Sequence, residues 1–317
     1  TQGCFSRYCG LTGGVRDLHK LDAVMLCRLT PVVWFTAVLF FLVVALADAD
    51  VDSSRGLLWK ISKPGQQPSW LFGTIHSEDP EVLELPPPVS QAFDASNSVA
   101  LEILMDADAM KYSSTAMLLL DGRTLPEIIG MPLYTKVAAV IATRGIPELV
   151  LNRMKPWAAA VTLSTPALET GEVLDRVLYQ DAVKQGKAVY GLETIQEQLD
   201  LFDNMPEADQ VLLLTEAVEN LQAVNAIQEE LLAAYKQRDL GRLLEINEAS
   251  MQTGDQRLAD DFQRRLVDDR NQHMAERMQP YLQQGKAFVA VGALHLPGKT
   301  GLLERLQQQG YTVTRVY

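Results

Sequence analysis

Two short stretches far apart in the chain share one pattern, in which an apolar run ends in Gly-x-x-His. Residues 70–76 have the sequence WLFGTIH, and residues 288–295 have the sequence FVAVGALH. Each apolar run is short and rich in β-branched and aromatic residues, which is typical of a buried strand. The glycine lets the backbone turn or lets another group approach closely. Because the chain has only four histidines, this shared context predicts a fold that brings both stretches together.

The composition is that of a folded protein with a substantial core. The 317 residues allow one large domain or two modest ones, and 47% of them are hydrophobic. The net charge of −12 argues against a nucleic-acid surface, which needs clustered Lys and Arg. No RRM, helix-turn-helix or zinc-finger pattern is present. We therefore expect no nucleic-acid partner, and the composition leaves the oligomeric state open.

Residues 29–47 carry no charge, follow Arg28 and end in small residues of the A-x-A type. A basic flank, an apolar run and such a site predict a secretory signal peptide. The alternative is an uncleaved anchor in the inner membrane, because an uncharged run of this length is just sufficient to span a bilayer. Met25 would begin a leader of ordinary size. Residues 1–24 are then not part of the natural product, and contact with a membrane is expected only through the leader.

The expected organisation is a leader at residues 1–49 and a single domain at residues 50–317. All three cysteines, Cys4, Cys9 and Cys27, precede the apolar run. The mature chain would therefore have no disulfide, thiol nucleophile or thiolate metal site. A cysteine-free exported protein suits a bacterial periplasm, where stray thiols would be oxidised. We predict a periplasmic location.

The remaining patterns predict alternating blocks of strands and helices. Apolar runs bounded by turn residues predict six strands, at residues 57–62, 70–76, 98–104, 187–192, 286–291 and 311–317. Apolar spacing of the i, i+3, i+4 type predicts helices at residues 87–95, 125–129, 133–143, 156–163, 173–184, 207–284 (with breaks near 239 and 253–254) and 300–309. The expected fold is α+β (mixed α/β): a small mixed sheet built from both chain ends and a middle strand, with helical blocks forming a cap.

His76 and His295 are the first candidates for chemistry. A single histidine at a strand end is more often structural, but two in matched contexts favour a shared function. Neutral imidazole is a common ligand of divalent first-row metals. Two histidines with one or two carboxylates, and one position left open for water, suit metal-assisted hydrolysis.

Glu102 lies within the apolar sequence VALEIL and would be costly to bury unless it is paired or bound to a metal. Alternatively, it faces solvent or ends the strand. Glu193 follows another predicted strand. Its alternative role is in the N-cap region of the helix that follows. Arg270 could stabilise a developing negative charge or hold a carboxylate. The sequence alone favours an exposed ion pair of Arg270 with Asp268 or Glu276.

Other histidines and other enzyme classes are less promising. His273 lies in a polar helical context and is expected at the surface, and His19 lies in the leader. The sequence has no G-x-S-x-G elbow, HExxH pair, P-loop or G-x-G-x-x-G.

An ordered set of segments carries a family resemblance across residues 56–317. The segments are LLWKI and LFGTIH near the start, VALE, VYGLETIQEQ, the pair Arg270-Asn271 with MAERM, and VGALH near the end. In this order they resemble the TraB/GumN family, which includes the Tiki proteins, and the chain looks like a bacterial GumN-like member. The resemblance implies one site under a helical cap, formed by strand ends from both ends of the domain.

In the Tiki branch, the resemblance implies a divalent-metal-dependent peptidase that uses manganese or cobalt, with zinc as an alternative. By position, His76, His295 and Glu102 would hold the metal, and Glu102, Glu193 and Arg270 would be catalytic. The expected partner is a peptide or protein substrate. The alternative is a periplasmic binding protein that sequesters a peptide or haem in the same pocket, although no axial haem ligand is convincingly placed. The TraB branch is associated with pheromone shutdown, which could be binding rather than cleavage.

Overall fold

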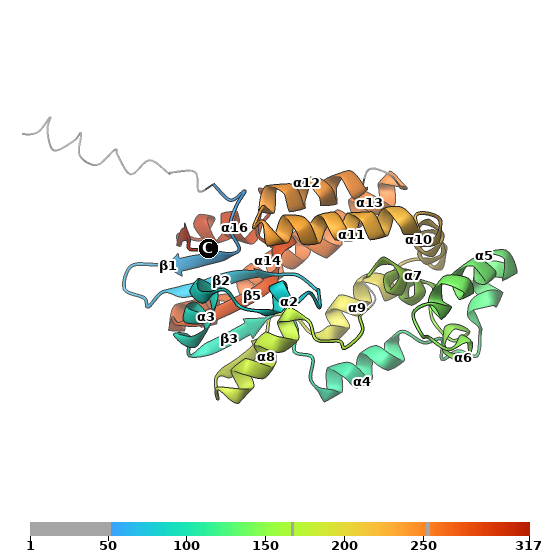
Figure 1. Ribbon diagram of the computed structural model, residues 1–317, viewed down its shortest axis with the longest axis horizontal. Coiled ribbons are helices and arrows are strands. Elements are labelled where there is room, and N and C mark those ends of the chain that lie inside the picture. The colour runs from blue at the N-terminus through green and yellow to red at the C-terminus, as the bar shows by residue number, and fades with distance from the viewer. Residues whose placement is uncertain (1–51, 166–167, 252–253) are drawn as a thin grey trace, which may run out of the picture. The chain divides into compact units, whose positions relative to one another are not determined.

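A mixed sheet of six strands, in the order β4-β3-β5-β2-β1-β6, organises the chain (Figure 1). The computed structural model describes residues 52–165, 168–251 and 254–317. The predicted leader, with its three cysteines and His19, lies outside the described residues. The strands are β1 (Leu58–Ser62), β2 (Ser69–Thr74), β3 (Ser98–Leu101), β4 (Ala188–Gly191), β5 (Ala287–Gly292) and β6 (Thr312–Arg315).

One side of the sheet is antiparallel. β1 and β2 form the predicted hairpin, and β6 pairs with the other edge of β1. The turn between β1 and β2 contains Gly65, whose φ of 80° lies in the left-handed region that favours glycine. The predicted mixed α/β fold is confirmed, because the sheet joins strands from both ends of the domain to β4 from its middle.

The other side of the sheet is parallel. β2 pairs with β5 so that Gly73 lies opposite Val291, and β3 pairs with β5 so that Leu101 lies opposite Ala290. Leu101 also lies opposite Gly191 of β4. Four carboxyl ends therefore meet at one edge of the sheet, which is where ligands bind in open α/β sheets.

Helices fill the connections between the strands. Around the first crossovers they are α2 (Pro80–Leu83), α3 (Pro87–Asp94), α4 (Ala107–Ala116), α5 (Leu125–Ala142), α6 (Glu148–Leu151), α7 (Pro156–Ser164) and α8 (Leu174–Lys184). Between β4 and β5 they are α9 (Ile195–Asp203), α10 (Glu207–Glu219), α11 (Leu221–Lys236), α12 (Leu240–Met251), α13 (Gln256–Phe262), a π-helix (Gln263–Asp268), α14 (Asp269–Arg277) and α15 (Gln279–Gln284). After β5 come a short 3₁₀ turn (Ala293–His295) and α16 (Leu302–Gln308).

Apolar side chains gather in two main cores. The larger core surrounds the sheet and includes Trp59, Phe72 and Phe288, all essentially inaccessible to solvent. The second core is built from α5, α7 and α10 around Trp157. In Figure 1, α5, α6 and α7 accordingly lie apart from the strands, whereas α8 lies beside β3. The helical block at residues 106–185 is thus divided between the two cores.

Among the described residues, α5 is the one helix whose length and composition would allow it to cross a membrane. Two features of α5 favour a role in packing. Gly130 has φ 75° and ψ 152°, which breaks the helix into two segments. Leu125, Tyr134, Val137 and Ile141 are buried in the second core.

Two local features differ from the sequence-based expectation. The third strand ends at Leu101 rather than at residue 104, so Glu102 follows the strand instead of lying inside it. The backbone carbonyl of Glu102 still accepts a hydrogen bond from the Glu193 N–H at 2.7 Å. This bond extends the contact between β3 and β4 beyond the strands. The π-helix before α14 was not predicted.

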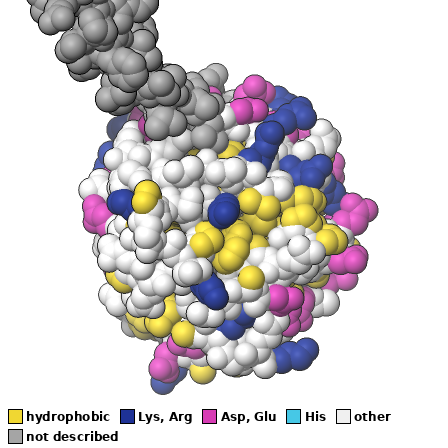
Figure 2. Space-filling model, turned by 90° about the vertical axis from the view of Figure 1, so that its left-hand side faces the viewer, with side chains coloured by type: hydrophobic (Ala, Val, Ile, Leu, Met, Phe, Trp, Pro, Cys, Tyr) yellow, Lys and Arg dark blue, Asp and Glu magenta, His cyan; other side chains and the backbone are white. Residues whose placement is uncertain are grey.

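Figure 2 shows one face of the molecule, with Lys, Arg, Asp and Glu side chains around an apolar area. Among the described residues, no histidine side chain is visible on this face.

The first prediction concerns Phe288, at the centre of the sheet core. Its ring lies 5.8 Å from that of Phe72 and 5.3 Å from that of Phe93, measured between centroids. We expect Phe288→Ala to lower the free energy of unfolding by about 3–5 kcal/mol, because it removes both contacts and leaves a cavity. Val316→Ala is the control: Val316 is exposed, so its change should stay within about 0.5 kcal/mol. Urea unfolding measures both, and equal losses would contradict this description of the core.

Candidate active site

The candidate residues follow directly after the parallel strands. Glu102 is the first residue beyond β3, and Glu193 is the second beyond β4. His295 ends the 3₁₀ turn that follows β5, and His76 lies two residues beyond β2. Because these strands are parallel and in register, all four side chains start from the same edge of the sheet.

Glu102 is held by groups from two other elements. The backbone N–H of Gly292 donates to its Oε1 at 2.5 Å. Arg270, from α14, donates through Nη2 to its Oε2 at 2.7 Å. Both carboxylate oxygens therefore have a partner, which meets the requirement for burying a charged group.

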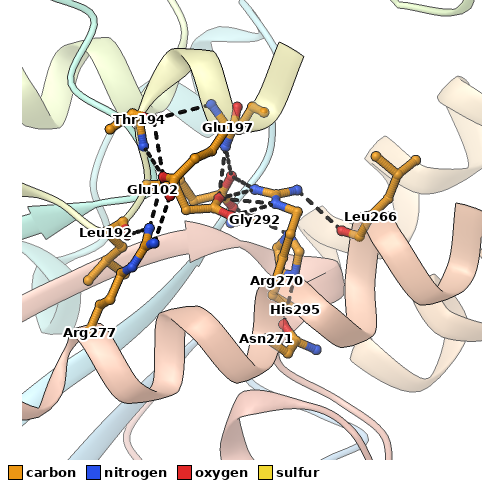
Figure 3. A network of polar contacts seen from close by, with 12 residues as sticks. Glu102, Leu192, Thr194, Glu197, Leu266, Arg270, Asn271, Arg277, Gly292 and His295 are labelled. Carbon is orange, nitrogen blue, oxygen red and sulfur yellow. Dashed lines mark hydrogen bonds and ion pairs between the residues drawn. The ribbon is translucent and has the colours of Figure 1, made fainter. Parts of the chain in front are cut away.

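Arg270 also holds Glu193, and Figure 3 shows its guanidinium between the residues of this network. Arg270 Nε lies 3.1 Å from Glu193 Oε1, and its Nη2 lies 2.7 Å from Glu193 Oε2. The side chains of Arg270 and Glu193 are only 14% and 5% exposed. The expected surface pair with Asp268 or Glu276 was wrong: helix pattern alone does not show which face of α14 meets the strand ends.

The charges around Arg270 shift the ionisation of this group of residues. Burial disfavours the Glu102 carboxylate, but the charges of His295 and Arg270 and the N–H of Gly292 outweigh burial and bring its pKa to about 2. Burial would lower the pKa of Arg270, and the two glutamates raise it instead. Burial lowers the pKa of His295, and with Arg270 it outweighs the charges of Glu102 and Glu193, which raise this pKa. The Glu102 pKa of about 2 includes the charge of a protonated His295; beside a neutral imidazole, Arg270 and the Gly292 N–H remain as the partners that favour the Glu102 carboxylate.

Asn271 fixes the tautomer of His295. The Asn271 amide donates through Nδ2 to the carbonyl of Thr300 at 3.0 Å. Its Oδ1 therefore faces His295 Nδ1, at 2.8 Å. An amide oxygen can only accept, so Nδ1 of the neutral imidazole carries the proton. The lone pair on Nε2 is left available.

That lone pair faces a carboxylate. His295 Nε2 and Glu102 Oε1 lie 3.6 Å apart, and both are acceptors when the imidazole is neutral. Two acceptors at this separation repel unless a proton or a cation is shared between them. The same arrangement, in which Nδ1–H is held by a protein oxygen and Nε2 is free, is the usual state of a metal-binding histidine.

His76 lies beside Asp175, a residue that the sequence analysis did not identify. Its Nε2 is 3.6 Å from Asp175 Oδ2, and the His76 side chain is 74% exposed. Thr74 donates its hydroxyl to Asp175 Oδ1 at 3.0 Å. Oδ2 is buried and has no hydrogen-bond partner among the described residues. Burial raises the pKa of this carboxyl, the nearby charge of Glu102 adds to that rise, and His76 and Thr74 oppose it.

The two motif glycines allow the close approach of these groups. A Cβ on Gly73 would lie 2.8 Å from Leu296 Cδ1 and 3.1 Å from Ala293 Cα, so the glycine lets the second motif pack against β2. A Cβ on Gly292 would lie 3.1 Å from Glu102 Oε1. Each glycine in Gly-x-x-His therefore makes room for another part of the site.

The donor atoms suit a divalent metal in kind. They comprise the free Nε2 of His295, the imidazole of His76, the Glu102 carboxylate and the unpartnered Oδ2 of Asp175. Imidazole and carboxylate ligands suit manganese, cobalt and zinc. Among the described residues, no three His, Cys, Asp or Glu side chains are already gathered closely enough to hold an ion. They form two His–carboxylate pairs, one at each Gly-x-x-His motif.

His273 and Glu197 lie outside the group of proposed ligands. His273 is exposed on α14, as expected. Glu197 caps the start of α9, where its carboxylate accepts from the Thr194 N–H at 2.8 Å and its two oxygens pair with Arg277 at 2.7 and 2.9 Å (Figure 3). These pairs, with Arg277 Nη1 bonded to the carbonyl of Leu192, fix the segment that carries Glu193.

The fold and the site define an α/β protein with a His/Glu/Arg centre at the carboxyl edge of parallel strands. The profile of the TraB/PrgY/gumN family matches residues 57–315. The chain belongs to this family.

Several curated relatives are named metalloproteases. Metalloprotease TIKI2 of Danio rerio is 25% identical over 313 residues, which are 82% of this chain and 60% of that protein. Metalloprotease TIKI1 of Danio rerio is 25% identical over 82% of this chain and 63% of its own length. Metalloprotease TIKI1 of Xenopus tropicalis is 24% identical over 89% of this chain and 68% of its own length. The chain thus spans about 60% of the first two relatives. No solved structure matches it.

The second prediction concerns Arg270. We expect Arg270→Met to lower the free energy of unfolding at pH 7 by about 3–5 kcal/mol, because it leaves two buried carboxylates without their cation. Arg265→Met is the matched control, since Arg265 pairs with the surface residue Asp261 at 2.9 Å and should lose at most about 1 kcal/mol. Urea unfolding of both variants checks the difference, and similar losses would rule out a structural role for the network.

The third prediction concerns pH. Arg277 is the main cause that lowers the Glu197 pKa to about 2; burial opposes this shift, and hydrogen bonds from Thr194 add to it. A lowered folded-state pKa stabilises the protein above the ordinary value near 4.5, and this stabilisation is lost as the pH falls towards 2. Both partners are partly exposed, so Glu197→Gln should cost only about 0.2–1 kcal/mol at pH 7.

That cost should shrink between pH 4.5 and pH 2. Urea unfolding of wild type and variant across this range measures it. Glu84→Gln, at an exposed position, controls for the general effect of removing one negative charge. A pH-independent difference between wild type and Glu197→Gln would contradict the assignment.

Proposed function

We propose that this chain is a divalent-metal-dependent hydrolase that cleaves peptide bonds. One observation carries the proposal: Glu102, Glu193, Arg270 and His295 converge from elements far apart in the sequence, and His295 directs Nε2 at Glu102 from 3.6 Å. A site that only stabilised the fold would have no need of an imidazole lone pair aimed at a carboxylate. The relatives named metalloproteases support the same class of activity.

His76, His295 and Glu102 are the proposed metal-holding residues, and manganese or cobalt is the proposed ion, with zinc as the alternative. When bound, such an ion lowers the pKa of a water molecule and polarises the substrate carbonyl. Asp175 adds a carboxylate beside His76. Asn271 keeps the Nε2 of His295 unprotonated at neutral pH through its contact at Nδ1.

Arg270 and Glu193 supply the electrostatic setting. Arg270 Nε and Nη2 point at Glu102 and Glu193, and Nη1 donates to the carbonyl of Leu266 at 3.3 Å. In the proposed mechanism, Arg270 keeps Glu102 ionised and stabilises the negative charge that develops on the reacting carbonyl, or positions the peptide. Glu102, or Glu193 beside it, would accept a proton during hydrolysis if it is not a ligand.

The proposed substrate is a peptide or protein, and the proposed location is outside the cytoplasm. The uncharged run at residues 29–47 supports export. The absence of cysteine after residue 27 supports the periplasm as the proposed location.

The fourth prediction tests the centre directly. We expect the chain, purified without chelators, to contain stoichiometric divalent metal and to cleave a generic peptide library in a metal-dependent way. His76→Ala/His295→Ala should lose both properties, because it removes the two imidazole donors. His273→Ala should keep both, since His273 is an exposed histidine outside the site. Elemental analysis measures the metal content, and mass spectrometry of the library measures peptide cleavage.

The outcomes separate the alternatives. Metal without cleavage would retain the site and favour a protein that sequesters a peptide or haem. No metal in wild type, even after manganese, cobalt or zinc is added, would overturn the metal centre. Equal metal content in the double variant would reject the assigned histidines.

A further inference from the structure

A cavity of about 420 Å³ opens directly beside the candidate centre. His76, Glu102 and Asp175 form its polar end. The rest of its wall is largely apolar and includes Leu101, Ile103, Met105, Met110, Val173 and Tyr179. This volume is near the lower end of the ~300–1,000 Å³ range of small-molecule sites. It suits a side chain with its neighbouring backbone rather than a folded partner.

The rim of the cavity exposes large apolar side chains. Met105 is 44% exposed, Met110 is 59% exposed and Leu168 is 48% exposed. These three are a large share of the exposed large hydrophobic side chains among the described residues, and all of them line this one cavity. Methionine is flexible and adapts to apolar partners of different shape. Clustered exposed apolar side chains next to a polar centre mark a binding surface.

The far wall of the cavity is fixed to the His76 motif. Glu78, two residues after His76, accepts from the backbone N–H groups of Glu169, Thr170 and Gly171 at 2.7, 2.8 and 2.5 Å. The Thr170 hydroxyl donates to the same carboxylate at 2.8 Å. The segment that carries Leu168 and Gly171 is thereby tied to the end of β2, so the cavity is part of a built site.

Charge restricts what this cavity can hold. Its polar end presents the carboxylates of Glu102 and Asp175. Arg176 also lines the cavity, where it donates to the carbonyl of Gly171 at 3.2 Å and lies 3.9 Å from Glu172, so the wall carries one cation beside the two carboxylates. An acidic side chain in the cavity would meet like charge and lose hydration, whereas an apolar one would bury area against the wall.

We propose that this cavity is the specificity subsite for a large apolar side chain, such as Leu, Met or Phe, in the residue next to the scissile bond. The inference rests on the proposed peptidase function, because His76 and Glu102 both line the cavity. It assigns the substrate class: peptides with a bulky apolar residue at the cleavage point. Met105 and Met110 determine the specificity, and Glu78 is a positioning residue that holds the wall.

The test uses the metal-loaded full chain and fluorogenic peptides of one sequence. The residue on either side of the scissile bond is Leu, Ala or Asp in turn. We expect kcat/KM for Leu to exceed that for Ala by ~10–100-fold, and Asp to be the poorest. Met110→Glu should reduce the Leu value at least about tenfold and so lower the ratio of the Leu value to the Ala value. Val183→Glu is the matched control, since Val183 is 54% exposed, close to the 59% of Met110, and does not line the cavity.

Equal cleavage of the three peptides, or equal effects of Met110→Glu and Val183→Glu, would overturn the subsite. If no peptide is cleaved, the peptidase proposal fails, and the cavity is then tested by fluorescence anisotropy with the labelled Leu and Asp peptides. Tighter binding of the Leu peptide that is lost in Met110→Glu but kept in Val183→Glu would support an apolar subsite in a binding protein. Equal binding of both peptides would reject it.

Discussion

A buried guanidinium, Arg270 of α14, joins the ends of two strands. It donates to Glu102 after β3 and to Glu193 after β4. Removing a charged group from water costs several kcal/mol unless an opposite charge offsets it. Here the attraction between the guanidinium and the two carboxylates offsets this cost for all three groups. The pairing therefore holds α14 against the edge of the sheet. Because Asn271 is the next residue on α14, the same docking brings its amide to His295.

The parallel register of the sheet makes this meeting possible. Gly73 lies opposite Val291, and Leu101 lies opposite both Ala290 and Gly191. The groups that follow these strands start at the same level, so short connections suffice to bring imidazoles and carboxylates together. Gly73 and Gly292 add the space, since a Cβ at either position would crowd the neighbouring motif or Glu102.

Much of this arrangement could be predicted from the sequence, because it depends on local pattern. The matched Gly-x-x-His motifs and the apolar runs before them located β2 and β5 and indicated that they meet. The partners of Arg270 could not be predicted: Glu102 is 168 residues away, and helix periodicity does not say which part of the sheet a face will meet. Asp175 was missed for the same reason, since an acidic residue in the first turn of a helix is ordinary.

Fold and family are therefore better defined by sequence than the chemistry of the site. The family match covers residues 57–315, but the relatives are only 23–25% identical. At such low sequence identity, the proposed activity depends on the geometry of the site. Here the decisive detail is a tautomer: the Asn271 amide, oriented by Thr300, makes Nε2 of His295 an acceptor.

The balance of charges around Arg270 also favours the proposed metal centre. Two carboxylates, Glu102 and Glu193, face one guanidinium, so one negative charge is unmatched. A protonated His295 would balance it, but burial and Arg270 lower the pKa of that imidazole and outweigh the opposing charges of Glu102 and Glu193. A divalent cation satisfies the carboxylates and the lone pair together, which is why we favour a metal centre. The adjoining cavity has a largely apolar wall, so an apolar substrate residue is its better complement.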